Sequence, residues 1–177
     1  MRTAALVGTI GFALAVSATG AAQAARPLPI PPAYRIVAEE YGVPPSILYA
    51  VALAESVRTL ENGAAPWPWT LNVRGRGLRF DTRESARKAL EELLEAGERP
   101  DVGLMQVSWR WHDRLLRDPQ LALDPWYNLR AGAAVLAAEH AATGDWWRAV
   151  GRYHSRDPEQ AARYRARVRA WHERIGR

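Results

Sequence analysis

The segment from Pro44 to Glu55 limits the fold more than any other part of this 177-residue chain. Its apolar residues, among them Ile47, Leu48 and Val51, recur at helical spacing and predict a helix buried in a hydrophobic core. Glu55 follows Val51 by four residues and Leu48 by seven, so it lies on the same apolar face. A carboxyl in that place loses hydration, which raises its pKa and lets it donate a proton near neutral pH. The segment therefore predicts both a helical core and a candidate general acid.

Residues 1–24 are typical of a secretory signal peptide, with Arg2, an apolar stretch from Ala4 to Val16, and small residues before an expected cleavage after Ala24. The apolar stretch has about 13 residues, fewer than the roughly 20 that span a bilayer, so a retained anchor is the less favoured alternative. Residues 25–32 are rich in proline and predict an extended lead-in, and residues 33–177 are expected to form one domain. The chain has no cysteine, which fits a periplasmic enzyme without disulfides or lipid attachment.

Hydrophobic periodicity and helix-end residues predict that the domain is mainly α. Asp81 and Glu84 have the spacing of a capping box, and Pro158 suits a first helical turn. Gly42 and Gly144 stand where helices should end. Helices are expected over residues 33–41, 44–55, 81–95, 109–116, 128–143, 145–153 and 158–175.

The stretch from Pro66 to Phe80 interrupts this helical pattern and predicts a small β-hairpin. Two β-prone runs, Trp69 to Val73 and Leu78 to Phe80, flank a turn that contains Gly75 and Gly77. A hairpin placed soon after Glu55 would form a wall of a substrate cleft.

Several short motifs follow one another along the chain: Glu55 and Ser56; Gly103, Leu104, Met105 and Gln106; Asn128, Leu129, Gly132 and Ala133; and Tyr153 after Ala149 and Val150. In this order and at these distances they resemble the lytic transglycosylase family with the soluble-transglycosylase, lysozyme-like domain. The stretch from Trp67 to Phe80 and the triplet from Tyr153 to Ser155 are also similar to the small transglycosylases that accompany conjugation, secretion or pilus systems. The resemblance implies a lysozyme-like helical domain with a β-hairpin wing.

The resemblance also implies a reaction on the glycan strands of peptidoglycan. Glu55 would protonate the oxygen of the β-1,4 bond between N-acetylmuramic acid and N-acetylglucosamine, and would then take the proton of the muramoyl C6 hydroxyl. In this family the 2-acetamido group is thought to assist at the anomeric carbon, so one essential carboxylate is enough, whereas most glycosidases use two. The alternative for Glu55 is a helix-end carboxylate paired with Arg58.

Further substrate-binding residues follow from the same resemblance. Gln106 would orient a sugar amide, and Met105 would lend main-chain contacts to the acetamido group. The Tyr153 hydroxyl would lie near Glu55, with a buried structural tyrosine as the alternative. Ser56 would bind near the acid or the acetamido group, or would instead cap the helix end. His154 stands where the family often has Asn, and it is either a substrate contact or a structural residue.

Tryptophan is abundant, with eight residues, and indole rings stack on sugars as well as filling helical cores. Trp67, Trp69 and Trp109, together with Trp111, are the candidates for a sugar platform because they lie near the hairpin and the Gln106 loop. We expect Trp146, Trp147 and Trp171 to pack between helices instead.

Asp101 decides between two reaction classes. We expect it to fix the loop before Gly103 by accepting backbone hydrogen bonds, and Asn128 to serve as a helix N-cap. If Asp101 instead reached the anomeric side of the sugar and activated a water, the protein would be a hydrolytic muramidase. A third alternative is a non-catalytic subunit that binds the cell wall.

The sequence predicts few other partners. The formal net charge is +5, and the arginines of the last helix are spread over more than one face, which is typical of a solvated surface. Neither a metal-ligand cluster nor a nucleic-acid-binding pattern is present, so we expect no cofactor, no metal and no nucleic acid. A monomer that acts with a secretion, conjugation or pilus apparatus is expected.

Overall fold

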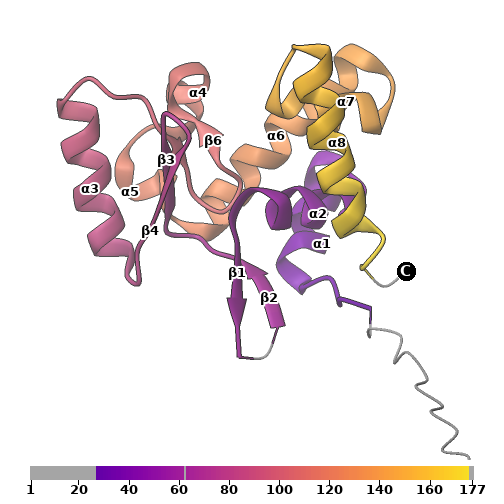
Figure 1. Ribbon diagram of the computed structural model, residues 1–177, viewed down its shortest axis with the longest axis horizontal. Coiled ribbons are helices and arrows are strands. Elements are labelled where there is room, and N and C mark those ends of the chain that lie inside the picture. The colour runs from indigo at the N-terminus through magenta and orange to yellow at the C-terminus, as the bar shows by residue number, and fades with distance from the viewer. Residues whose placement is uncertain (1–26, 62, 176–177) are drawn as a thin grey trace, which may run out of the picture.

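The computed structural model describes residues 27–61 and 63–175, and helices dominate this part of the chain. The helices are α1 (Pro32–Tyr41), α2 (Pro45–Ser56), α3 (Arg83–Glu95), α4 (Trp109–Leu116), α5 (Pro119–Ala122), α6 (Pro125–Thr143), α7 (Trp146–His154) and α8 (Pro158–His172). Figure 1 shows α1, α2, α6, α7 and α8 gathered on one side of the molecule, and the sheet with α3 on the other. The mainly α, lysozyme-like prediction is confirmed.

Helix α2 lies in the centre of the core. Leu48, Val51 and Leu53 are fully buried, and the helix is apolar around most of its circumference. Pro45 at its first position fixes a helical φ where no N–H partner is needed. Each buried leucine contributes about 2 kcal/mol to stability, so this segment is a large part of the folding free energy. As a result, the residue that ends the apolar run, Glu55, has a fixed position.

A four-stranded antiparallel sheet forms the second side of the molecule. Its strands β3 (Thr70–Val73), β4 (Arg76–Arg79), β5 (Asp101–Val102) and β6 (Val107–Ser108) are arranged in the order β4-β3-β5-β6. Leu71 of β3 pairs with both Leu78 and Val102, and Asp101 pairs with Ser108. The predicted hairpin is therefore confirmed, and its central strand brings the 101–108 loop beside it.

A second hairpin was not predicted. Strands β1 (Val57–Leu60) and β2 (Gly63–Pro66) pair antiparallel directly after α2. Their sequence contains charged and small residues in place of the alternating β-branched pattern that indicates a strand. The helix therefore ends at Ser56 because the chain turns at once into β1.

Helix ends agree with the sequence in part. Gly42 and Gly144 adopt the left-handed conformation at the ends of α1 and α6, and Pro158 occupies the first turn of α8, all as predicted. The prediction of a capping box at Asp81 is wrong, because the Thr82 side chain caps α3 by accepting a hydrogen bond from the Ser85 N–H. Helix α3 therefore begins two residues later than expected.

The two ends of the described chain pair with each other. Leu28 forms a parallel bridge with Ile175, and its N–H donates to the Arg174 carbonyl at 2.7 Å. The part of the predicted 25–32 lead-in that is described is therefore attached to the domain. The predicted signal peptide, residues 1–24, lies outside the described residues. Within the described part of the chain, no helix has the length and apolar character needed to cross a membrane.

Candidate active site

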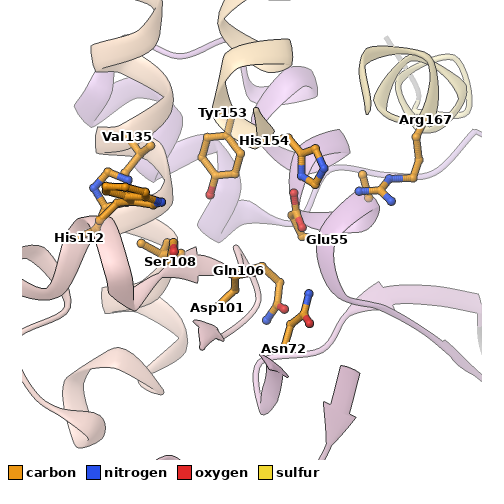
Figure 2. A pocket seen from close by; sticks show the side chains of 13 residues that line it. Glu55, Asn72, Asp101, Gln106, Ser108, His112, Val135, Tyr153, His154 and Arg167 are labelled. Carbon is orange, nitrogen blue, oxygen red and sulfur yellow. The ribbon is translucent and has the colours of Figure 1, made fainter. Parts of the chain in front are cut away.

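A cavity of about 370 Å³ opens between the sheet and the helices, and Glu55 is part of its lining. In Figure 2, Tyr153, His154 and Arg167 come from the helical side, whereas Asn72 and Gln106 come from the sheet side. Glu55 stands between these two groups. The fold therefore surrounds the Glu55 carboxyl, near the end of α2, with polar side chains from both the sheet and the helices.

The Glu55 carboxyl has a strongly perturbed pKa. Loss of hydration raises it from an ordinary value of 4.5 to about 7, against the opposing influence of Tyr164 and Arg167, which favour the ionised form. The nearby Asp101 carboxyl raises it further by charge repulsion. Arg58 pairs with Asp81 at 3.0 Å, so it is not the partner of Glu55 that one interpretation of the sequence suggested. A carboxyl with this pKa can donate and accept a proton at neutral pH.

Tyr164 and Arg167 form a second layer behind Glu55 that the sequence did not predict. The Tyr164 ring is 2% exposed and stacks on the His154 ring at 4.6 Å between centroids. The Arg167 guanidinium lies over the same tyrosine ring at 5.0 Å from its centroid. The Tyr164 hydroxyl interacts with the Glu55 carboxyl outside ideal hydrogen-bond geometry and has no other partner among the described residues. Both residues belong to the arginine-rich last helix, where no motif distinguishes them.

Gln106 presents a free amide oxygen to the cavity. Its Nε2 donates to the carbonyls of Thr70 at 3.1 Å and Gly103 at 2.8 Å, which fixes the orientation of the amide. No described residue donates to its Oε1, so this atom can accept a hydrogen bond from a sugar acetamide. The backbone of Gln106 has a φ of +48°, an uncommon value for a side-chain-bearing residue, which the surrounding loop must enforce.

That loop is held by Asn128, which is buried in α6. Its Oδ1 accepts a hydrogen bond from the Met105 N–H at 2.9 Å, and its Nδ2 donates to the Val102 and Ala122 carbonyls, each at 3.0 Å. The predicted N-cap role is wrong, because α6 begins earlier and Asp124 is its cap. Gly103 makes the approach possible: its φ is +82°, and a Cβ there would lie 2.3 Å from the Asn128 side chain.

A hydrogen bond connects Tyr153 to the backbone of Met105. The Tyr153 hydroxyl donates to the Met105 carbonyl at 2.8 Å, and the Met105 side chain is fully buried. The expected main-chain contacts of Met105 with substrate are therefore not available at its N–H, which Asn128 occupies. The Tyr153 ring lines the cavity, and burial together with the charges of Glu55 and Asp101 raises the pKa of its hydroxyl, which agrees with the expected place of this hydroxyl near Glu55.

Ser56 has a structural position. It is fully buried, and its hydroxyl donates to the Leu104 carbonyl at 2.7 Å while accepting from the Trp67 N–H at 3.2 Å. Because no surface of Ser56 reaches the cavity, its assignment to substrate binding is corrected. The hydroxyl instead connects the end of α2 to the loop that carries Gln106.

Asp101 lines the cavity beside Asn72 and Ser108. Burial raises the pKa of the Asp101 carboxyl, and a hydrogen bond from Ser108 opposes that rise. We expected this carboxylate to accept backbone hydrogen bonds and fix its loop. It instead presents a second titratable carboxyl to the space that Glu55 faces.

Trp111 is the tryptophan at the cavity, and it is 75% exposed. The sugar-platform assignment of Trp109 is wrong, because this residue is buried in the core. Trp67 and Trp69 are half-buried, pack edge-on against each other and do not line the cavity, so their assignment stays a prediction. The Trp67 indole also donates to the Phe80 carbonyl at 2.7 Å, which holds it against the hairpin. Trp146, Trp147 and Trp171 pack against the core as predicted. His154 lines the cavity, and burial together with the charge of Arg167 lowers its pKa.

Comparison with known proteins agrees with this geometry. The family model of the transglycosylase SLT domain matches residues 33–166, which include every residue that lines the cavity except Arg167. No curated protein matches the chain significantly. The matched region covers well over half of the sequence and ties the cavity to a single enzyme family. The chain belongs to the transglycosylase SLT domain family, whose members are lytic transglycosylases that act on peptidoglycan.

Proposed function

We propose that the protein cleaves the β-1,4 bond between N-acetylmuramic acid and N-acetylglucosamine without water and leaves a 1,6-anhydromuramoyl end. The observation that carries this proposal is the pKa of about 7 for the Glu55 carboxyl in an open cavity. At that pKa the protonated and ionised forms are both populated at neutral pH. One carboxyl can therefore act first as an acid and then as a base.

In the first step, protonated Glu55 gives its proton to the glycosidic oxygen as the bond from that oxygen to the muramoyl C1 breaks. In the second step, ionised Glu55 takes the proton of the C6 hydroxyl while the C6 oxygen forms a bond to C1. The carboxyl ends the cycle protonated, and no water is consumed. Tyr164 and Arg167 favour the ionised form of Glu55, so they stabilise the state between the two steps.

Two further groups would position the sugar. The free Oε1 of Gln106 would accept a hydrogen bond from the 2-acetamido N–H, which would place that group beside the anomeric carbon. The exposed Trp111 ring at the rim of the cavity would pack against the muramoyl unit and its substituents.

The second candidate function is hydrolysis of the same bond, and Asp101 is the observation in its favour. Its carboxyl lines the same cavity as Glu55, so an ionised Asp101 would be able to activate a water or stabilise a positively charged C1. The family whose model matches residues 33–166 consists of lytic transglycosylases, which favours the reaction without water. We therefore rank the non-hydrolytic reaction first.

Mass spectrometry of purified sacculi after digestion tests both reactions. Muramoyl products that are lighter by one water, with no reducing muramic acid ends, are the expected result. Reducing ends without anhydro ends would replace the transglycosylase by a muramidase. Adding Asp101→Asn to the comparison assigns the water-activating group, because this change would abolish hydrolysis but leave the anhydro product in place.

The Glu55→Gln variant tests whether the protein is an enzyme at all. Its amide cannot transfer the proton, so release of muropeptides should fall by at least about a thousandfold. Glu92→Gln, the same change at an exposed position of α3, serves as the matched control and should release muropeptides like the unaltered protein. Unchanged release by Glu55→Gln would reject Glu55 as the proton donor, and the absence of release by the unaltered protein would leave only a wall-binding subunit.

We also propose that the protein works in the periplasm, as a monomer, and opens the wall locally for a secretion, conjugation or pilus apparatus. The signal-like residues 1–24 and the resemblance of the Trp67–Phe80 and Tyr153–Ser155 segments to small transglycosylases of such systems support this role. Cell fractionation with an antibody, combined with light scattering of the purified protein, tests location and oligomeric state. A cytoplasmic fraction would rule out access to the wall.

A further inference from the structure

A second cavity of about 570 Å³ continues from the first. The two share Trp111, His112, Val135, Tyr153 and His154, so a ligand bound beside Glu55 can extend from one into the other. The lining that belongs to the second cavity alone consists of Glu139 of α6, Arg152 of α7, and Ser155 and Arg156 just beyond α7. None of these four residues is used in the proton transfers described above.

This second cavity carries an excess of positive charge. The Glu139 carboxylate is 17% exposed and meets two cations: Arg152 Nε at 2.8 Å and an Arg156 nitrogen at 3.4 Å. One carboxylate cannot neutralise both guanidinium groups. Arg152 is held in place by the shorter ion pair, whereas the Arg156 side chain is 77% exposed and reaches Glu139 only at the longer distance. The Arg156 guanidinium therefore has N–H groups directed to solvent that can bind a further carboxylate.

The lining that the two cavities share includes an exposed aromatic side chain. The Trp111 side chain is 75% exposed where the two cavities meet, which is unusual for so large an apolar surface. An exposed ring next to an arginine pair suits a ligand that has both apolar groups and a carboxylate. Glycan strands of peptidoglycan carry such a substituent, because the lactyl group of each muramic acid bears a short peptide with free carboxylates.

We propose that the second cavity binds the carboxylate-bearing peptide of the muramic acid whose glycosidic bond lies at Glu55, with Arg156 as the principal carboxylate receptor. Arg152 adds positive charge, and Trp111 covers the apolar part of the peptide. This inference rests on the proposed function, because it assumes that a glycan strand occupies the first cavity. Such a peptide site makes the protein selective for glycan strands that retain their peptides over strands whose peptides have been removed.

The test compares kcat/KM on two substrates: glycan strands with peptides, and the same strands after an amidase has removed the peptides. A hydrogen-bonded charge pair contributes about 1.5 kcal/mol, so the unaltered protein should prefer peptide-bearing strands by roughly tenfold. Arg156→Gln should reduce the ratio of the two kcat/KM values to near one. Arg156→Lys, which keeps the charge but loses the planar fork, should give an intermediate ratio.

Arg148→Gln is the matched control, since it removes the same charge from an exposed position of α7 outside both cavities. This variant should keep the full preference. Circular dichroism melts confirm that each variant is folded. The inference is overturned if the unaltered protein has no preference, or if Arg156→Gln retains it.

A binding measurement separates this inference from the proposed reaction. Calorimetry with Glu55→Gln protein and soluble muramoyl fragments, with and without the peptide, reports recognition in the absence of turnover. Tighter binding of the peptide form that is lost in the Glu55→Gln/Arg156→Gln protein supports the inference even if no bond is cleaved. Equal cleavage of both strands together with equal binding of both fragments would uphold the reaction and reject the peptide site.

Discussion

The raised pKa of Glu55 predicts that this carboxyl destabilises the folded protein above neutral pH. Its pKa is about 7 in the fold against an ordinary value of 4.5. The folded state therefore binds the proton more tightly than the unfolded chain, and stability falls as the pH rises from about 4.5 to about 7. A difference of about 2.5 pH units corresponds to roughly 3 kcal/mol, and we reduce this to about 2 kcal/mol because part of the carboxyl remains in contact with water.

The Glu55→Gln change removes this cost while keeping the shape of the side chain. We expect the variant to be more stable than the unaltered protein by about 2 kcal/mol at pH 8, or about 4–8 °C in Tm, and equally stable at pH 4. Urea denaturation followed by tryptophan fluorescence at the two pH values measures both differences. Glu92→Gln controls for the loss of one negative charge. Equal stability of Glu55→Gln and the unaltered protein at pH 8 would refute the reasoning, because it would mean that the ionised carboxyl is well solvated.

Two further predictions concern neighbours of this carboxyl and its loop. Tyr164→Phe removes a group that favours ionised Glu55, so the pKa of Glu55 should rise and the alkaline limb of the pH profile of kcat/KM should move up by about one unit; a limb that stays in place would contradict the Tyr164 contact. Gly103→Ala should cost more than about 3 kcal/mol, because its Cβ would overlap Asn128 in addition to the left-handed strain. Gly97→Ala has the same strain at a φ of +81° but nothing within 4 Å, so a cost of only about 1–2 kcal/mol in the same urea titration is the expected contrast.

The helical part of the fold was predictable because its signals are local. The apolar spacing before Glu55 and the glycine at residue 144 each act within one or two turns of a helix. The β1–β2 hairpin was missed because its residues have no alternating pattern, and pairing depends on where α2 ends. The role of Asn128 was mispredicted for a similar reason. Asparagine is a common N-cap residue near the start of a helix, but two hydrogen-bond partners of Asn128 lie 23 and 26 residues earlier in the sequence.

The candidate site was predictable where a motif marks a residue and not where only tertiary packing does. The raised pKa of Glu55 and the place of Gln106 in the cavity follow from their motifs. Tyr164 and Arg167 lie in a helix whose many arginines give no indication of which side chain turns inward. Among the tryptophans, position near the loop did not distinguish the buried Trp109 from the exposed Trp111, two residues later, because that difference depends on the orientation of α4.

The three hydrogen bonds of the Asn128 amide have a consequence for how the cavity meets its substrate. Moving the Gly103–Gln106 loop away from α6 would break the hydrogen bond from the Met105 N–H to the Asn128 Oδ1 and leave both buried groups unpaired, at a cost of about 1–3 kcal/mol for each group. The loop therefore opens only when the core itself opens, and its amide hydrogens should exchange with solvent at the slow rate of global unfolding. A sugar that enters the cavity finds the Gln106 Oε1 acceptor already in position, so little conformational entropy is lost on binding. Discrimination between sugars then depends on how well each one fits a rigid cavity wall.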